Sequence, residues 1–305
     1  MITTGQLRRI AARSGTRQMR NVEIDIILTL LLQLFHERGL LDHLAFKGGT
    51  MLRKMVFGPR GRLSTDLDFT LRSQIARDDL MMALLESFGR SYRGLRFQLD
   101  QSNDWYLADE SCGVNPLCAH DDNPGGIRIK LQVSLRERPV LPVVARAQIP
   151  QEYFALLDFA PAAIPALALE EVLAEKIRAA SQRSKIRDLY DLSESLNLEF
   201  DRPRMRGLAV LKLWCQRDAL SYERLKKRIE EATDYDVGDL TDLLRKDQRA
   251  DLATLVKRVV EGYRFLSNLT ELESTLASDK AGKAQAEADQ LTQELCPTPR
   301  VPREY

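Results

Sequence analysis

The sequence predicts an α+β fold in which a region of mixed strands and helices is followed by an all-α region. Two segments of strand length, residues 64–71 and 127–133, alternate apolar and polar side chains. After Pro165, apolar residues recur at helical spacing in every periodic segment. We therefore expect a mixed sheet flanked by helices within residues 1–165 and a helical domain over residues 166–277.

The first region begins with helices and then alternates strands with helices. In residues 21–35, apolar side chains cover most of the helix surface, which suits a helix buried against a sheet. The next expected elements are a strand at 44–47, a helix at 50–56, a strand at 64–71, a helix at 76–88, a strand at 95–99, a loop at 100–126 and a strand at 127–133.

The second region contains only helical patterns. The expected helices span residues 166–180, 185–195, 204–215, 221–232, 237–246 and 249–276. From residue 278 onward, Ala, Lys, Gln, Glu and Pro dominate without an apolar stripe. We therefore expect a flexible tail over residues 278–305.

Composition limits the class of protein. The chain has 305 residues, with 45 Lys and Arg against 44 Asp and Glu, and the net charge of +1 argues against a general coat for polyanions. Four cysteines form no disulfide framework, and no N-terminal segment has a signal-peptide pattern. The most apolar run, residues 26–35, is far shorter than the roughly 20 residues that span a bilayer. We expect a cytoplasmic protein with no membrane partner.

The strongest chemical signal is Lys47-Gly48-Gly49-Thr50 followed by Asp66-Leu67-Asp68. Two carboxylates at alternate positions of a strand project from one face, where they can share hard cations bridged by nucleotide phosphates. The glycines let the backbone approach a triphosphate, and Thr50 offers a hydroxyl at the start of a helix. The pattern therefore predicts a metal and triphosphate site.

A structural alternative exists for each fragment taken alone. Asp-x-Asp is also typical of the solvated face of an edge strand, and Gly-Gly of an ordinary turn. The order of the two fragments, the placement of the carboxylates on a strand and the apolar residues behind them favour the site.

Three stretches of the sequence resemble a known family: residues 46–54, residues 62–69, and residues 169–176 continuing to 187–192. In order and spacing they match a Gly-Gly-Ser/Thr plus Asp-x-Asp motif, a helical lysine and an Arg-Asp-Leu-x-Asp-Leu motif. The family is that of AbiEii-type nucleotidyltransferase toxins, including MenT-like toxins of type IV-like toxin–antitoxin systems, within the DNA polymerase beta-like nucleotidyltransferase superfamily. The resemblance covers roughly residues 40–195.

The resemblance implies roles for individual residues. Asp66 and Asp68 would be catalytic and would hold Mg²⁺ or Mn²⁺. Lys176, which would contact the triphosphate, and Asp191, the acid of the last motif, would also be catalytic. The implied nucleotide-binding residues are Lys47, Gly48, Gly49, Thr50, Ser64, Lys130 and Asp188.

Lys176 and the acids after it require a break in the helix. In one continuous helix the Cα atoms of Lys176 and Asp191 would lie about 22 Å apart, too far to share a site. We therefore expect two helices separated near Ser184. A surface role in ion pairs is the alternative for Lys176, Asp188 and Asp191, and the choice between the two acids stays open.

One feature departs from the superfamily. Many members carry a third acid on a later strand, but here the polar face of the strand at 127–133 presents Arg128, Lys130 and Gln132, with Ser134 beyond it. A third acid helps to deprotonate the attacking hydroxyl, so the base must come from elsewhere or the metal must activate the attack. Lys130 could instead face the nucleotide.

Two weaker signals complete the analysis. Cys112, Cys118 and His120 are close in sequence, but a fourth zinc ligand is not evident. The densest basic segment, residues 202–228, is either a solvated helix face or an RNA-backbone surface.

By resemblance, the chain would be a toxin that transfers a nucleoside monophosphate from a nucleoside triphosphate to RNA, at the 3′ end of tRNA, and so blocks translation. Residues 1–165 would form the polymerase beta-like nucleotidyltransferase core with N-terminal helices, and residues 166–277 would complete the nucleotide site. A cognate antitoxin would be its protein partner. The alternatives are nucleotidylation or phosphorylation of a protein by the same site, and a nucleotide-binding module without catalysis.

Overall fold

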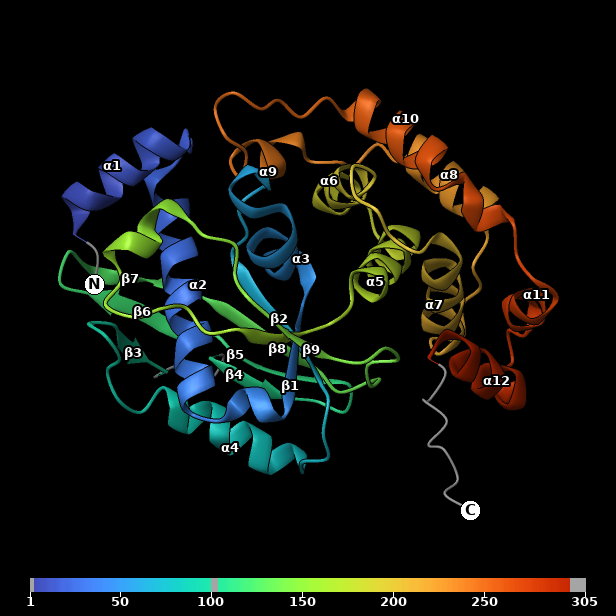
Figure 1. The fold of residues 1–305 in the computed structure, drawn as a ribbon, viewed down its shortest axis with the longest axis horizontal. Coiled ribbons are helices and arrows are strands. Elements are labelled where there is room, and N and C mark those ends of the chain that lie inside the picture. Colours follow the sequence, from blue (N-terminus) through green and yellow to red (C-terminus); the bar gives the residue numbers. More distant parts are fainter. Residues whose placement is uncertain (1–2, 100–103, 297–305) are drawn as a thin grey trace, which may run out of the picture. The chain divides into compact units, whose positions relative to one another are not determined.

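The structure, a computed structural model, describes residues 3–99 and 104–296. The chain forms two compact units, each described by itself below (Figure 1). The first unit contains Met1–Pro139, Val143–Leu167 and Gly238–Ala250, and the second contains Val140–Pro142, Ala168–Val237 and Asp251–Tyr305.

The first unit is built on a seven-stranded mixed sheet with the strand order β4-β5-β8-β2-β1-β10-β9. Its strands are β1 (Leu44–Lys47), β2 (Asp66–Leu71), β4 (Trp105–Leu107), β5 (Ser111–Val114), β8 (Lys130–Ser134), β9 (Val144–Arg146) and β10 (Ile164–Ala166). β2 pairs antiparallel with β1 and parallel with β8. This mixed sheet, with helices around it, confirms the expected α+β class.

A second sheet lies where the sequence analysis expects a loop. It has the order β3-β6-β7, formed by β3 (Arg96–Gln98), β6 (Leu117–His120) and β7 (Asn123–Arg128). The expected loop at 100–126 is therefore wrong for most of its described residues, and the expected strand at 127–133 is divided at Ile129 between the two sheets. Short strands rich in Gly, Pro and Asn carry little local signal, so their partners determine them.

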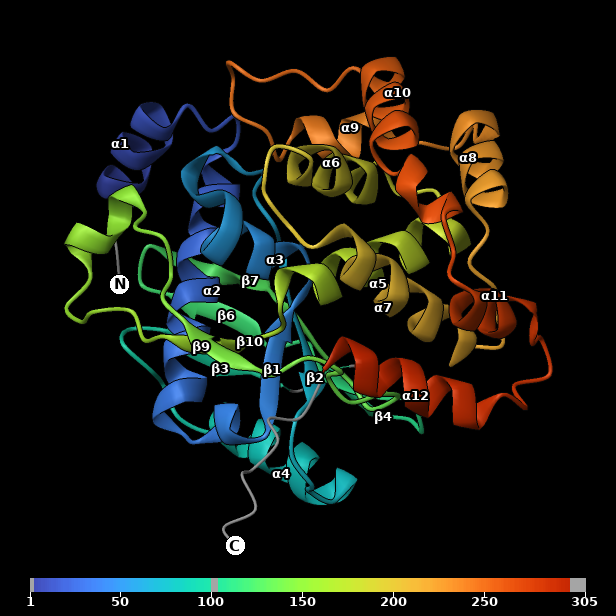
Figure 2. The ribbon, with the colours of Figure 1, turned by 45° about the vertical axis from the view of Figure 1, so that its right-hand side comes forward.

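Helices cover the sheet of the first unit. They are α1 (Thr4–Ser14), α2 (Met19–Glu37) and α4 (Arg77–Ser87), with the short helices η1 (Leu40–Asp42), η3 (Gly58–Arg60) and η4 (Glu152–Leu156). α2 lies alongside the strands in both views (Figures 1 and 2). Phe35 of α2 packs edge-on against Phe69 of β2, with ring centroids 6.0 Å apart, so α2 packs on the apolar face of β2.

A buried network anchors the helical turn that follows β1. α3 (Gly48–Leu52) continues into the π-helical turn η2 (Arg53–Phe57). Nζ of Lys54 lies 2.9 Å from Oδ1 of Asp25 and 2.8 Å from Oγ1 of Thr29, and it also contacts the hydroxyl of Tyr153. Burial raises the pKa of Asp25, but the charges of Lys54 and Arg53 outweigh this effect and lower it overall. The pair thus fixes η2 against α2 as an internal salt bridge.

A late segment of the chain belongs to the first unit. It begins with α9 (Val237–Thr241), which is shorter than the expected helix at 237–246. The backbone N–H of Leu63 donates to the carbonyl of Leu243 at 2.9 Å, and that of Lys246 donates to Gly15 at 2.7 Å. The segment therefore holds the loop that leads into β2 and the turn that follows α1.

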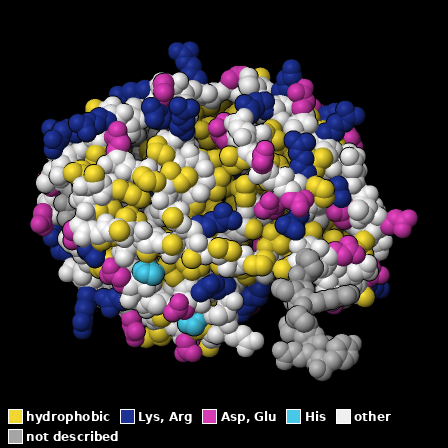
Figure 3. Space-filling model, viewed as in Figure 1, with side chains coloured by type: hydrophobic (Ala, Val, Ile, Leu, Met, Phe, Trp, Pro, Cys, Tyr) yellow, Lys and Arg dark blue, Asp and Glu magenta, His cyan; other side chains and the backbone are white. Residues whose placement is uncertain are grey.

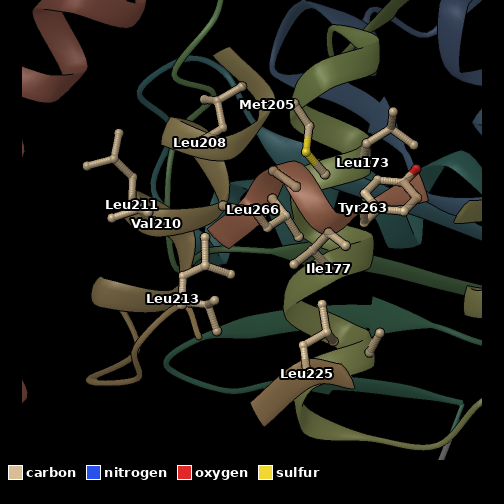
Figure 4. Packing of buried hydrophobic residues seen from close by; sticks show 14 of the residues in the cluster. Leu173, Ile177, Met205, Leu208, Val210, Leu211, Leu213, Leu225, Tyr263 and Leu266 are labelled. Carbon is tan, nitrogen blue, oxygen red and sulfur yellow. The ribbon is translucent and has the colours of Figure 1, made fainter. Parts of the chain in front are cut away.

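The second unit is all-α around one apolar core (Figure 4). Its helices are α5 (Leu169–Gln182), α6 (Ile186–Ser195), α7 (Arg202–Trp214), α8 (Tyr222–Glu231), α10 (Leu252–Gly262), η5 (Arg264–Ser267), α11 (Glu271–Ser278) and α12 (Gln285–Leu295). Leu173 and Ile177 of α5 meet Met205 and Leu208 of α7 in this core, with Tyr263 beside them.

The last helices differ from the sequence expectation. The single helix expected at 249–276 is divided into α10, η5 and α11, because Thr270 and Glu273 form a capping box that starts α11. The flexible tail expected from residue 278 is wrong for residues 285–295, which form α12. Ala288, Leu291 and Leu295 of α12 are buried in the core. Their spacing is helical, but the Ala and Gln residues around them weaken the apolar pattern in the sequence. Residues 297–305 of the expected tail lie outside the described part.

Surface charge is mixed. On the face shown in Figure 3, basic and acidic side chains are interspersed, in keeping with the net charge of +1. None of the helices in the described ranges has the length and apolar character needed to cross a membrane.

The packing of α12 leads to a test. Leu291→Ala should lower the free energy of unfolding by about 2–4 kcal/mol, because it leaves a cavity in the core of the second unit. Gln293→Ala, on the exposed side of the same helix, should change it by less than about 0.5 kcal/mol. Urea denaturation of both variants measures the difference. Equal stabilities would mean that α12 does not pack as described.

Candidate functional site

Asp66 and Asp68 lie on one face of β2, at alternate positions, and both are half-buried. Leu67 and Phe69 alternate with them and are fully buried on the opposite face. The strand therefore presents two carboxylates with an apolar backing, the arrangement that the alternation predicts.

Gly48 brings the backbone against the second carboxylate. β1 and β2 pair so that Lys47 lies opposite Asp68, and Gly48 follows with φ of +79°. A Cβ at Gly48 would lie 2.6 Å from Oδ2 of Asp68. Only glycine fits here, because a side chain would be strained and would also overlap the carboxylate.

A cradle of polar groups continues at Gly49. A Cβ at Gly49 would overlap Nη2 of Arg62 and would lie 3.4 Å from Oγ of Ser64. Arg62 and Ser64 are buried, and α3 begins at Gly48 without a side-chain cap, so its first N–H groups lack helical partners. The sequence analysis gave Arg62 no role, although it precedes the Asp-x-Asp motif. A backbone nest beside a buried guanidinium and a hydroxyl can hold phosphate oxygens.

The hydroxyl of Thr50 is placed differently from the expectation. It is buried and donates to the backbone carbonyl of Asp66. Its proton therefore holds α3 to the start of β2, and any bond from Thr50 to a phosphate would come from its backbone N–H.

The neighbouring strand β8 carries no acid at the site. Lys130 pairs in register with Asp66, and Gln132 with Asp68. The position beside Asp68 is therefore an amide, as the alternation of residues 127–133 predicts.

Tyr106 is a candidate that sequence analysis missed. Tyr106, Gly113, Gln132 and Asp68 form one row across β4, β5, β8 and β2. A Cβ at Gly113 would lie 2.7 Å from Cε1 of Tyr106, so the ring leans over the glycine. Burial raises the pKa of Tyr106, a hydrogen bond with Ser111 opposes this, and the charge of Asp68 raises it further. The signal was hidden because β5 and β8, the two strands between Tyr106 and Asp68 in the sheet, both follow Tyr106 in sequence, whereas Asp68 precedes it by far.

The donor set suits a hard cation that is shared with a substrate. Within the described ranges, no group of three or more His, Cys, Asp or Glu side chains is placed to hold a metal by itself. Mg²⁺ commonly binds one or two carboxylates and takes its other ligands from phosphates and water. The residues present therefore fit Mg²⁺ or Mn²⁺ at Asp66 and Asp68.

The second unit contains the helical lysine and the later acids. α5 ends at Gln182 and α6 begins at Ile186, which confirms the break expected near Ser184. Nζ of Lys176 lies 2.7 Å from Oδ1 of Asp188 and 2.8 Å from Oδ2 of Asp191. Both acids therefore contact the lysine, and all three residues are buried.

The charges of Lys176 and Arg183 keep the carboxyl of Asp188 ionised. Burial raises the pKa of Asp188, but the charges of Lys176 and Arg183 outweigh it, and the net pKa lies well below the usual range. A carboxyl with a depressed pKa stabilises the fold above its unfolded pKa of about 4, and this contribution is lost only as pH falls through the lower folded value. Asp188 therefore remains ionised at neutral pH.

Part of the basic segment at 202–228 serves the interior. Lys212 is buried and lies 3.0 Å from Oε1 of Glu171. Arg206 lies 2.8 Å from Oε2 of Glu273. These two cations are neutralised within the second unit, so the segment is not a continuous RNA-backbone surface.

The cysteines form no zinc site with His120. Cys112 lies in the large sheet, whereas Cys118 and His120 lie on β6 of the small sheet. Nε2 of His120 lies 2.9 Å from Oε1 of Glu23. Burial raises the pKa of Cys112 to about 11 and that of Cys118 to about 12, so both remain thiols at neutral pH.

Comparisons with known proteins bear on this site. The model of the nucleotidyl transferase AbiEii toxin family, type IV toxin–antitoxin system, matches residues 29–264. The structure of MenT4, a nucleotidyltransferase toxin from Mycobacterium tuberculosis H37Rv, is similar over 97% of this chain and 100% of that chain, with 25% sequence identity and a TM-score of 0.79. JHP933 from Helicobacter pylori is 17% identical over 85% of this chain and 96% of its own, with a TM-score of 0.48. The comparison with curated proteins gives no significant match.

The family match spans well over half of the chain and includes the Asp66 and Asp68 pair, the glycine turn and the Lys176 cluster. The chain therefore belongs to the AbiEii family of nucleotidyltransferase toxins of type IV toxin–antitoxin systems.

Proposed function

We propose that this toxin transfers a nucleoside monophosphate from a nucleoside triphosphate to the 3′ end of tRNA and releases pyrophosphate. A tRNA with a blocked 3′ end cannot carry an amino acid, so translation stops. The reaction takes place in the cytoplasm, and a cognate antitoxin restrains it.

The observation that carries the proposal is the contact between Gly48 and the carboxylate of Asp68. It supports a triphosphate bound where backbone N–H groups and two acids meet. Mg²⁺, or Mn²⁺, held by Asp66 and Asp68 would neutralise the phosphates and orient the reacting oxygens.

The chemistry is an in-line displacement at the α-phosphorus. The 3′-hydroxyl oxygen of the acceptor forms a bond to the α-phosphorus, while the bond from this phosphorus to the bridging oxygen breaks. Pyrophosphate leaves with that electron pair. Arg62, Ser64 and the N–H of Gly49 hold the leaving phosphates, and their fixed positions stabilise the charge as it develops.

The hydroxyl proton needs an acceptor other than a carboxylate on β8. Gln132 occupies the position beside Asp68, and an amide does not take up a proton at neutral pH. We propose that the proton passes to solvent.

We propose that Lys176 contacts the triphosphate and that Asp188 and Asp191 orient its ammonium. The support is the resemblance of its motif to that of the family and its buried position between two carboxylates. A purely structural ion cluster is the alternative, and the third prediction below separates the two.

The first prediction concerns the carboxylate pair. Asp68→Asn keeps the side-chain size but removes the charge, so it should lower transfer at least about 100-fold and abolish growth inhibition. Asp122→Asn, at an exposed position, should retain both. Incubation with labelled nucleoside triphosphates and total cellular RNA or protein measures transfer, and thermal melting checks the fold. Label in protein rather than RNA would point to the other acceptor class, and bound but unconverted nucleotide to a module without catalysis.

The second prediction concerns Gly48. Gly48→Ala should reduce transfer at least about 100-fold, because the added methyl displaces the Asp68 carboxylate. Gly15→Ala is a matched control, since Gly15 also has positive φ but the nearest atom to its Cβ is 3.8 Å away. Both variants carry backbone strain, so similar losses of stability with unequal losses of transfer are expected. Equal transfer would argue against the close approach as a catalytic requirement.

The third prediction compares two buried lysines of the second unit. Lys176→Met and Lys212→Met each remove the buried ammonium from a cluster of carboxylates, so each should lower stability by about 3–5 kcal/mol. Only Lys176→Met should raise the Michaelis constant for the nucleoside triphosphate, measured well below both melting temperatures. If the two variants use nucleotide equally well, the Lys176 cluster is structural.

A further inference from the structure

A polar groove of about 750 Å³ opens in the first unit beside Asp66. Its floor continues the active face of the sheet through Asp66, Lys130 and Asn115. Its wall is the beginning of α2, with Gln18, Arg20 and Asn21. We call it the Asp66 groove.

The groove carries positive charge that the protein does not neutralise. Arg20 and Lys130 are exposed, and the structure gives neither of them an ion-pair or hydrogen-bond partner among the described residues. Arg128, which also lines the groove, bonds to the buried carboxylate of Asp104. Arg20 and Lys130 therefore remain available to a ligand, beside the carboxylate of Asp66, which would bind the proposed metal.

Arg20 has no favourable electrostatic interaction with its own helix. It stands in the first turn of α2, which contains no acid, and a cation is unfavourable at the positive end of the helix dipole. Its removal should therefore not destabilise the fold, which makes it a clean position for a test.

The groove and the phosphate cradle lie on opposite sides of β2, because Lys130 of β8 lines the groove, whereas Gly48 and Gly49 follow β1, the other neighbour of β2. Asp66 lines the groove, whereas Asp68 contacts the turn at Gly48. In an in-line displacement the attacking oxygen and the leaving pyrophosphate are on opposite sides of the α-phosphorus. With the leaving phosphates at Gly48 and Gly49, after β1, the acceptor would enter from the β8 side, where the groove opens.

We propose that the Asp66 groove binds the single-stranded 3′ end of the RNA acceptor, with Arg20 and Lys130 contacting its backbone phosphates. This inference rests on the proposed function. Gln18 offers an amide group for a base edge, and the volume is within the range of ligand pockets, which suits a few unpaired nucleotides at the end of a strand. It also assigns Lys130 to the acceptor instead of the nucleotide.

The test uses the full chain and an RNA hairpin with a short single-stranded 3′ extension, labelled with a fluorophore. Arg20→Glu and Lys130→Gln should each weaken hairpin binding at least about 10-fold at low salt and reduce the salt slope by about 0.7 for each lost phosphate contact. Arg20→Glu should keep the wild-type affinity for nucleoside triphosphate. Arg9→Glu is the matched control, because Arg9 is exposed on α1 and does not line the groove; it should bind the hairpin like the wild type.

Transfer to total cellular RNA separates the possible failures. If the wild type labels RNA while both variants retain its hairpin affinity and salt slope, the groove inference is overturned and the proposed function stands. If the wild type labels protein or nothing, both fail. Equal weakening by Arg9→Glu would also overturn the inference, because the effect would then be one of general charge. A raised Michaelis constant of Lys130→Gln for nucleotide, with hairpin binding unchanged, would mean that Lys130 contacts the nucleotide, and would overturn its role in the groove.

Discussion

The active face depends on the close approach between Gly48 and Asp68. The antiparallel register of β1 and β2 places Lys47 opposite Asp68, and the chain then turns with positive φ into α3. A slip of one residue would move the carboxylates to the apolar face. The contact between the rings of Phe46 and Phe69, whose centroids lie 5.3 Å apart, opposes such a slip. The same register thus sets the core and the distance between backbone N–H groups and carboxylates.

The turn at Gly48 is supported from two sides. Lys54, one turn beyond α3, bonds to Asp25 and Thr29 in α2, so the helix that starts at Gly48 is fixed at its far end. The loop before β2 is fixed by Leu243 through a backbone hydrogen bond to Leu63. Sites with a fixed frame lose less free energy to reorganisation when charge develops in the reaction. These buried polar contacts therefore position the site, whatever they contribute to stability.

Local patterns predicted the parts of the fold that are local in origin. The alternation around Leu67 and Phe69 gave β2, and helical spacing gave α5 and the break before α6. β3 falls within the expected strand at 95–99, whereas β6 and β7 were missed because they are short and β7 contains Gly, Pro and Asn. The packing of residues 238–250 on the first unit was missed because their partners lie far along the chain. In the site, the carboxylates and glycines form a motif, whereas Tyr106 reaches the same row only through strand pairing.

The amide of Gln132 bears on the side from which the acceptor hydroxyl approaches the nucleotide. Tyr106 lies in the same row, and its raised pKa keeps the phenol protonated at neutral pH, so it can donate a hydrogen bond but cannot accept a proton as a base. Neither Gln132 nor Tyr106 can therefore serve as the base. The proposed acceptor groove opens at Asp66, where Lys130 is the neighbour in register. The loss of the third acid and the position of the groove thus favour the same direction of approach for the acceptor.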